Sequence, residues 1–170
     1  MTDILITLFG IIQLIGGVIG AGGSLLAEIF YVRAMRDGTV DAAERAHLAM
    51  VGHTLRFGMM LLLAGSIGLT LTAFVYENAP QPALSQSYWI LMGLVFVIIF
   101  FSWALSRRQV GFTLASAAIF TAWWYVVLHL VGYVPTANFG EAVALFTVLT
   151  ALVAGVVKYA RVITTEKVIP

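Results

Sequence analysis

Five long apolar stretches, separated by short polar breaks, dominate the chain. They cover residues 4–32, 57–76, 88–106, 110–134 and 142–159. A membrane-spanning helix needs about 20 apolar residues, and a bilayer offers no water to an unpaired backbone, so we expect each stretch to be helical. Pro80 and Pro82 fall in the second break, and Arg107 and Arg108 form a polar turn in the third. The pattern predicts an all-α, five-helix transmembrane bundle that forms one polytopic membrane domain.

Composition indicates that lipid is the main solvent of this chain. Of its 170 residues, 61% are hydrophobic and only 10% are charged, which is more apolar surface than a water-soluble domain of this length can bury. The absence of cysteine excludes disulfides, thiolate nucleophiles and cysteine-based metal sites. The first residues lack a basic segment and include Asp3. We therefore expect the first stretch to stay as a membrane helix rather than to act as a cleaved signal peptide.

Basic residues occur only in alternate connections. The nine are Arg33, Arg36, Arg45, Arg56, Arg107, Arg108, Lys158, Arg161 and Lys167, which lie around the first connection, in the third and in the C-terminal segment. The amino terminus and the second and fourth connections carry only acids, Asp3, Glu77 and Glu141. By the positive-inside rule, we expect an integral membrane protein of a bacterial inner membrane. Its amino terminus should lie outside and its carboxyl terminus in the cytoplasm.

The segment MRDGTVDAAE, which ends at Glu44, resembles the second half of an EF-hand calcium loop. Positions 1 and 3 of such a loop would be Arg33 and Met35, which replace two oxygen ligands, so calcium binding is disfavoured. A tight turn fits better: Gly38 ends the first helix, and Asp41 with Glu44 has capping-box spacing. The second helix should then begin near Asp41. Helices one and two would project roughly 15–20 Å into the cytoplasm as a hairpin.

One face of the first stretch consists of small and polar residues. Its members are Gln13, Gly16, Gly20, Ser24 and Glu28, which share one side of a helix. Small residues let helix backbones approach, and glycines also permit local unwinding beside a polar path. Close helix packing and a polar pathway or binding face both remain open. We expect Glu28 near the cytoplasmic surface, as an ion pair with Arg56 or as a proton- or cation-handling group.

The second helix carries a stripe at every third position that includes His47, Met50 and His53. Such ligands suit copper(I), but each step of three turns backward by about 60° around the helix. At most two residues, best Met50 and His53, could reach one ion. A membrane haem needs two axial histidines, and His129 is expected about 30 Å from His53 across the bilayer. A haem would therefore have to join the His53 residues of two subunits.

Three consecutive aromatic residues, Trp123, Trp124 and Tyr125, lie in the outer half of the fourth stretch. Such residues suit two roles. One is the lining of a site for a quinone, a lipid or another apolar ligand. The other, which is commoner and which we expect here, is an aromatic anchor in the outer leaflet.

The sequence contains no glycine-rich phosphate loop, nucleophile elbow or HExxH motif, and no basic, aromatic-interleaved segment that suggests nucleic acid. Three functions remain open. The first is a small channel or transport-type protein that acts as an oligomer through the polar face of helix one. The second is a redox subunit that binds haem or quinone. The third is an accessory subunit of a membrane complex. The expected partners are the bilayer and either further copies of the chain or a partner membrane subunit.

Overall fold

Helices make up the regular structure of the chain. The computed structural model describes residues 2–34, 41–76, 81–134 and 138–166, and within these ranges it contains helices and no strand. The helices are α1 (Thr2–Ala34), α2 (Ala42–Val75), the short 3-10 helix η1 (Pro82–Leu84), α3 (Gln86–Ser106), α4 (Phe112–Leu130) and α5 (Phe139–Glu166). In this described part, five helices are long and apolar enough to cross a membrane. The prediction of a five-helix membrane protein is confirmed at this level.

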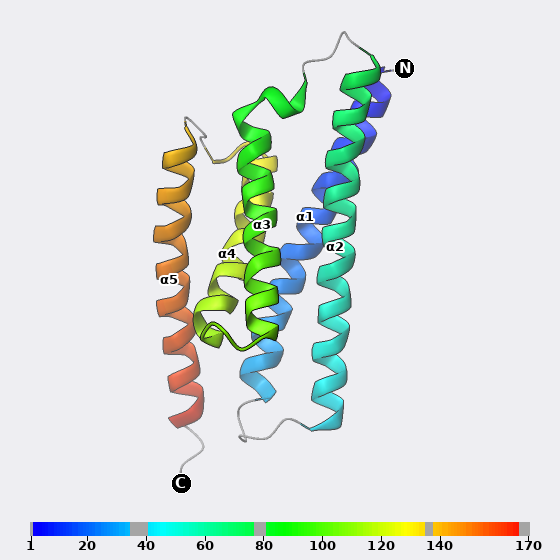
Figure 1. Cartoon of the computed structure of the whole chain (residues 1–170). Coiled ribbons are helices and arrows are strands. Elements are labelled where there is room, and N and C mark those ends of the chain that lie inside the picture. Colours follow the sequence, from blue (N-terminus) through cyan, green and yellow to red (C-terminus); the bar gives the residue numbers. More distant parts are fainter. Residues whose placement is uncertain (1, 35–40, 77–80, 135–137, 167–170) are drawn as a thin grey trace.

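The start of α2 confirms the predicted capping box. The Glu44 amide donates to Asp41 Oδ1 at 2.7 Å, and the Asp41 amide donates to Glu44 Oε2 at 3.1 Å, so two backbone donors at the helix start are satisfied reciprocally. The helix therefore begins at Ala42, well before the apolar stretch that starts at residue 57. Figure 1 shows α2 reaching past the α3–α4 connection. The predicted turn at Gly38 lies outside the described residues.

Helix α4 lies at the centre of the bundle. It packs against α1, α3 and α5, while α1 and α2 form the closest pair (Figure 1). The largest fully buried side chains include Leu62 on α2 and Trp123, Tyr125 and Val126 on α4. Helix α5 lies at the edge, packs mainly on α4 and leaves most of its surface exposed. The four helices α1–α4 thus enclose the interior that is available for a site.

Glycines allow the close approach of α1 and α2. A Cβ atom at Gly58 would lie 2.9 Å from both the Gly16 carbonyl oxygen and the Gly20 nitrogen, and a Cβ at Gly65 would lie 2.7 Å from the Gln13 backbone nitrogen. Contacts this short are not tolerated, so only glycine fits at these points. The small residues Gly16 and Gly20 are therefore occupied by helix packing.

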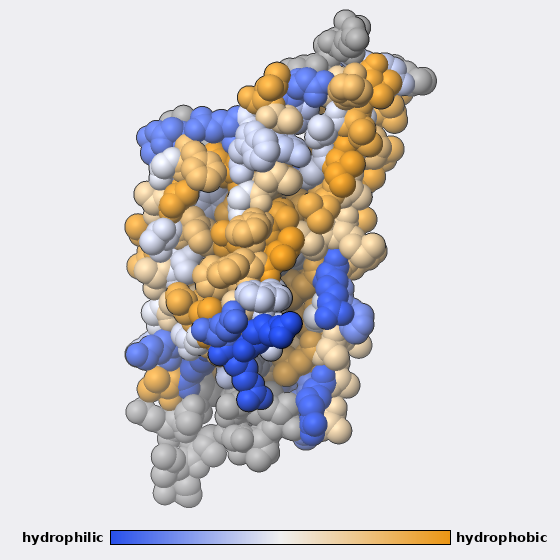
Figure 2. Space-filling model, in the orientation of Figure 1, coloured by the Kyte–Doolittle hydropathy of each residue, from blue (hydrophilic) through white to orange (hydrophobic). Residues whose placement is uncertain are grey.

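The two ends of the bundle differ in charge. We call the end where α1 stops, α2 starts and α3 meets α4 the basic end, because it includes Arg33, Arg45, Arg107 and Arg108. Figure 2 shows hydrophobic residues over the middle of one face, with hydrophilic residues toward the ends. The other end, which holds the start of α1 and the end of α4, is called the opposite end.

Candidate functional site

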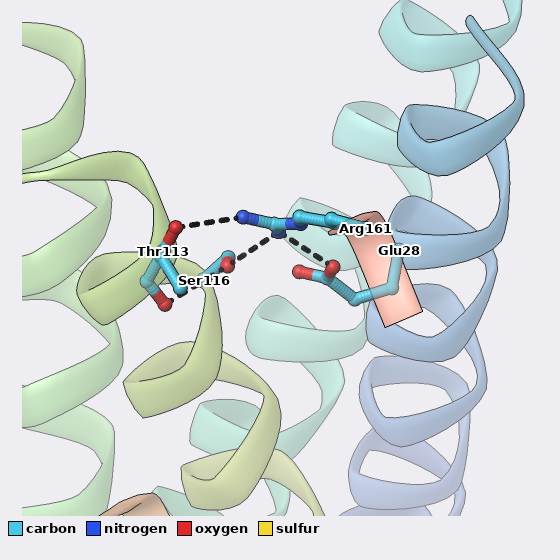
Figure 3. A network of polar contacts seen from close by, with 4 residues as sticks. All are labelled: Glu28, Thr113, Ser116 and Arg161. Carbon is cyan, nitrogen blue, oxygen red and sulfur yellow. Dashed lines mark hydrogen bonds and ion pairs between the residues drawn. The ribbon is translucent and has the colours of Figure 1, made fainter. Parts of the chain in front are cut away.

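An ion pair and two hydrogen bonds from the same arginine join three helices near the basic end. Arg161 on α5 donates from Nη2 to Glu28 Oε2 on α1, and these two atoms are 2.8 Å apart (Figure 3). Arg161 Nη2 also donates to Ser116 Oγ at 3.0 Å, and Nη1 donates to Thr113 Oγ1 at 3.0 Å, both on α4. Only 17% of the Arg161 side chain and 14% of the Glu28 side chain are exposed. An unpaired charge that is this strongly buried would be costly. The opposite charge and the hydroxyl groups reduce this cost for both side chains.

Two aromatic rings complete the surroundings of the guanidinium group. The Arg161 Cζ atom lies 4.7 Å from the centroid of the Tyr31 ring and 4.9 Å from that of the Phe112 ring. These two rings also stack on each other, with centroids 4.1 Å apart. The negative ring faces attract a cation at this distance. The side chain of Arg161 is therefore held by a carboxylate, two hydroxyls and two rings.

The expected ion pair between Glu28 and Arg56 is wrong. The rings of Phe30 and His47 stack, and Gly20 lies against Gly58, so the antiparallel register of α1 and α2 places Glu28 opposite about residue 50 of α2. Arg56 lies six positions further along that helix, which is about 9 Å. The sequence predicts a similar depth for the two residues, but it contains no local signal of this register. The ion-pair partner of Glu28 is Arg161, on a helix that the sequence did not connect with it.

A cavity of about 420 Å³ lies beside the ion pair. Its wall includes Glu28, Tyr31, Phe112 and Ser116 from the network just described, and Ser24 from the same face of α1. The remaining lining is mostly apolar and comes from all four helices α1–α4. This Glu28 cavity therefore combines one charged and hydroxylated wall with an otherwise apolar surface, a composition typical of sites for small molecules.

A second cavity of about 350 Å³, the Arg56 cavity, lies next to the first. The two share Leu55, Ser102 and Ile119 in their walls. The Arg56 cavity also includes Met59 on α2 and reaches Trp123 in the centre of the bundle. Together the two cavities extend from the basic end toward the middle.

A third, smaller cavity of about 210 Å³ lies at the opposite end and is lined by His129 and Gln13. His129 is 8% exposed, and its Nε2 lies 3.0 Å from the Ser87 carbonyl oxygen and 2.9 Å from Ser87 Oγ. A carbonyl oxygen only accepts, so Nε2 carries the proton. Nδ1 is buried and has no hydrogen-bond partner among the described residues. In a neutral imidazole that carries its proton on Nε2, Nδ1 is an acceptor, and this buried acceptor has no partner among the described residues.

Gln13 lines the His129 cavity together with Ser66, its hydrogen-bond partner on α2. Gln13 Nε2 donates to Ser66 Oγ at 2.8 Å, and Ser66 Oγ donates to the Leu62 carbonyl oxygen at 2.8 Å. Gln13 and Ser66 both line the His129 cavity. The predicted polar face of α1 is thus divided by the structure. Gln13 borders one cavity, Ser24 and Glu28 border another, and the glycines between them are packed.

The expected outer-leaflet anchor is wrong for two of the three aromatic residues. Trp123 and Tyr125 are each 1% exposed, whereas Trp124 is 39% exposed. Successive residues turn by about 100° around a helix, so one run cannot face the lipid throughout. Trp123 packs over Gly20, where a Cβ would meet its ring. The Tyr125 hydroxyl donates to the Ala142 carbonyl oxygen at 3.5 Å, and its side chain borders a small apolar cavity of about 100 Å³ between α3, α4 and α5.

The three candidate metal ligands of α2, His47, Met50 and His53, lie on its surface. Met50 is 66% exposed, and His47 and His53 are exposed as well. His47 stacks on Phe30, and His53 Nδ1 lies 2.8 Å from the Ala49 carbonyl oxygen, to which it donates. Among the described residues, no group of three or more His, Asp or Glu side chains is placed to hold a metal ion. The structure thus does not gather the three residues into one pocket.

Comparisons with protein-family models, with curated proteins and with solved structures found no match. The helices define the chain as a small polytopic helical membrane protein. The cavities and the residues that line them are the features of this chain that bear on its function.

Proposed function

We propose that the chain is a small transport-type membrane protein whose path runs between α1, α2, α3 and α4. One observation carries this proposal: cavities with polar walls lie at opposite ends of the same four helices. Polar and ionisable side chains inside membrane helix bundles commonly serve substrates or ions. The path lies within one chain, so it does not require the pore between subunits that the sequence suggested.

The barrier between the cavities is short. On α2, Ser66 lines the His129 cavity and Met59 lines the Arg56 cavity, which are seven positions or about 10 Å apart along the helix. On α3, Leu91 and Ile98 line the same two cavities at the same spacing. About two helical turns of packed side chains therefore close the path. A modest movement of α3 against α2 would be enough to change access, because these two helices are not closely packed on each other.

Apolar residues form this barrier. Leu62 and Val126 are fully buried between the cavities, and Trp123 covers Gly20 beside them. The packing of a bulky indole on a glycine lets α4 close tightly on α1. The distribution of basic residues supports an orientation in which the basic end, with the Glu28 cavity, faces the cytoplasm. The His129 cavity would then face the exterior.

Flux through purified protein in liposomes tests the proposal. Proton flux is measured with a pH-sensitive dye inside the vesicles, and uptake of the small cation methylammonium is measured in parallel. We expect the wild-type protein to exceed protein-free vesicles with at least one probe. Trp123→Ala should raise that flux several-fold because it removes the largest side chain of the barrier. Trp124→Ala, a half-exposed neighbour on the same helix, is the matched control and should leave the flux unchanged.

Two results would contradict the proposal. The first is flux at the protein-free level for both probes with both wild type and Trp123→Ala, although size-exclusion chromatography shows that each is folded. The second is an equal rise for Trp123→Ala and Trp124→Ala, which would indicate general leakiness rather than an opened barrier.

A further inference from the structure

We infer that the Glu28 cavity is a binding site for amphipathic organic cations, and that Arg161 is the cation held by the charged wall of this cavity until a ligand displaces it. This inference names a substrate class for the proposed transport function and rests on it for that step. The carboxylate, the two hydroxyls and the two rings that contact the Arg161 guanidinium are all groups that recognise a planar cation.

The recognition surface uses three kinds of contact at once. Glu28 supplies the charge at 2.8 Å, and Ser116 and Thr113 supply hydroxyl acceptors at 3.0 Å (Figure 3). Tyr31 and Phe112 supply ring faces within 5 Å of Cζ. Carboxylates and aromatic faces together favour a cation that is weakly hydrated, such as a guanidinium. A free organic cation would find the same partners.

The same residues open onto space for a ligand. Glu28, Tyr31, Phe112 and Ser116 are all part of the wall of the cavity of about 420 Å³, a size within the usual range for small-molecule sites. Beyond them the wall is apolar, with Leu55 from α2 among its residues. A ligand that fills this space therefore needs an apolar body attached to its positive group.

The hydrogen-bonding capacity of the pair favours a cation over an anion. Arg161 uses both terminal nitrogens, Nη1 toward Thr113 and Nη2 toward Glu28 and Ser116. Glu28 makes its hydrogen bond to Arg161 through Oε2, so the other carboxylate oxygen keeps acceptor sites. An arriving cation can approach this oxygen before Arg161 leaves. An anion would be repelled by the same free carboxylate oxygen of Glu28.

Displacement of Arg161 would free one end of α5. This helix lies at the edge of the bundle, and Arg161 is the residue through which it forms an ion pair with α1. Ligand binding and the attachment of α5 are therefore coupled, since both draw on Glu28. Removing the resident cation should raise ligand affinity, because an apparent affinity is lowered by the fraction of molecules in which the site is filled.

Equilibrium dialysis of the detergent-purified full chain tests the site. The probe is phenylguanidinium, and phenylurea is the neutral control of nearly the same shape. We expect the wild type to bind phenylguanidinium at least tenfold more tightly than phenylurea. Glu28→Gln should abolish this preference. Arg161→Gln should raise the affinity for phenylguanidinium about tenfold or more, while Lys158→Gln, which removes an exposed charge one turn away on α5, should not.

Hydrogen exchange on the wild type tests displacement without any substitution. Saturating phenylguanidinium should speed amide exchange in α5 around Arg161, and phenylurea should not. This measurement decides the matter if Arg161→Gln does not fold. Equal binding of the two probes, unchanged exchange in α5, or equal affinities of Arg161→Gln and Lys158→Gln would each overturn the inference.

The failures of the two proposals are distinguishable. Charge-selective binding without flux in liposomes would leave a cation-binding membrane protein and refute transport. Flux of protons without charge-selective binding would support transport and refute the assignment of organic cations as the substrate class.

Discussion

Glu28 and Arg161 should be energetically coupled, and a double-mutant cycle measures the coupling. Removing one partner of a fully buried ion pair costs about 3–5 kcal/mol, because the other charge is left unpaired. The two side chains here are 14% and 17% exposed, so solvent reduces this penalty. We expect Glu28→Gln to lower the free energy of unfolding by about 2–3 kcal/mol on that basis.

Arg161→Gln should cost more, about 3–4 kcal/mol, because it also removes the hydrogen bonds to Thr113 and Ser116 and the contacts with two rings. The double variant should cost less than the two single variants together, with a coupling of about 1–3 kcal/mol. Two neutral amides leave no unpaired charge, which is the physical reason for the difference.

Reversible unfolding of the purified protein in mixed micelles with sodium dodecyl sulfate, followed by circular dichroism, provides these free energies. Lys158→Gln is the control for loss of a positive charge on α5, and it should change stability by less than about 0.5 kcal/mol. Additive effects of Glu28→Gln and Arg161→Gln, with a coupling below about 0.5 kcal/mol, would refute the view that this pair holds α5 to α1.

Three further predictions test the packing, the cap and the surface histidines. Gly20→Ala should lower the free energy of unfolding by about 1–3 kcal/mol, because the added methyl group meets the indole ring of Trp123. Gly10→Ala is the control: its methyl group meets nothing within 4 Å, so it should be neutral or stabilising, and equal effects of the two substitutions would contradict the packing. Asp41→Ala should cost about 0.5–2 kcal/mol in the same assay and speed exchange in the first turn of α2, and unchanged exchange would argue against the cap. The purified protein should show no Soret band when oxidised or reduced with dithionite, because His53 lies toward the basic end and His129 at the opposite end, so these two residues of one chain cannot bind one haem; a band that is lost in His53→Ala would restore a haem between two subunits.

The helices were predictable because their signal is local. Hydropathy over about 20 residues is enough to find a spanning helix, and all five were found. The start of α2 was predictable for the same reason, since Asp41 and Glu44 are three residues apart and form a capping box without help from other helices. Such features depend on neighbours in the sequence.

The candidate site was only partly predictable, because it depends on how helices pack. Gln13, Ser24 and Glu28 were selected from one face of α1, and all three border cavities. Arg161 was missed as a partner because it lies 133 positions from Glu28, and nothing local connects them. The choice of Arg56 failed for want of the register between α1 and α2.

Burial within α4 was equally hidden from the sequence. Lipid and protein interior are both apolar, so hydropathy does not separate core residues from lipid-facing ones in a membrane helix. Trp123 and Trp124 are adjacent and chemically identical, yet one is 1% and the other 39% exposed. The one signal that was present is Gly20, because a glycine in a membrane helix often marks a point where another group approaches closely.

We expect the cavities at the two ends of the bundle to open toward opposite sides of the membrane with a closed barrier between them, and cysteine accessibility tests this arrangement most directly. The chain has no cysteine, so single substitutions can be labelled from each side with a small, membrane-impermeant methanethiosulfonate. Ser87 lines the His129 cavity and Ser102 lines the Glu28 and Arg56 cavities, and both residues are exposed. We expect Ser87→Cys to react only from outside and Ser102→Cys to react only from the cytoplasmic side. Leu62 is fully buried in the barrier, so Leu62→Cys should react from neither side. Labelling of Ser87→Cys and Ser102→Cys from the same side, or of neither in folded protein, would contradict the account.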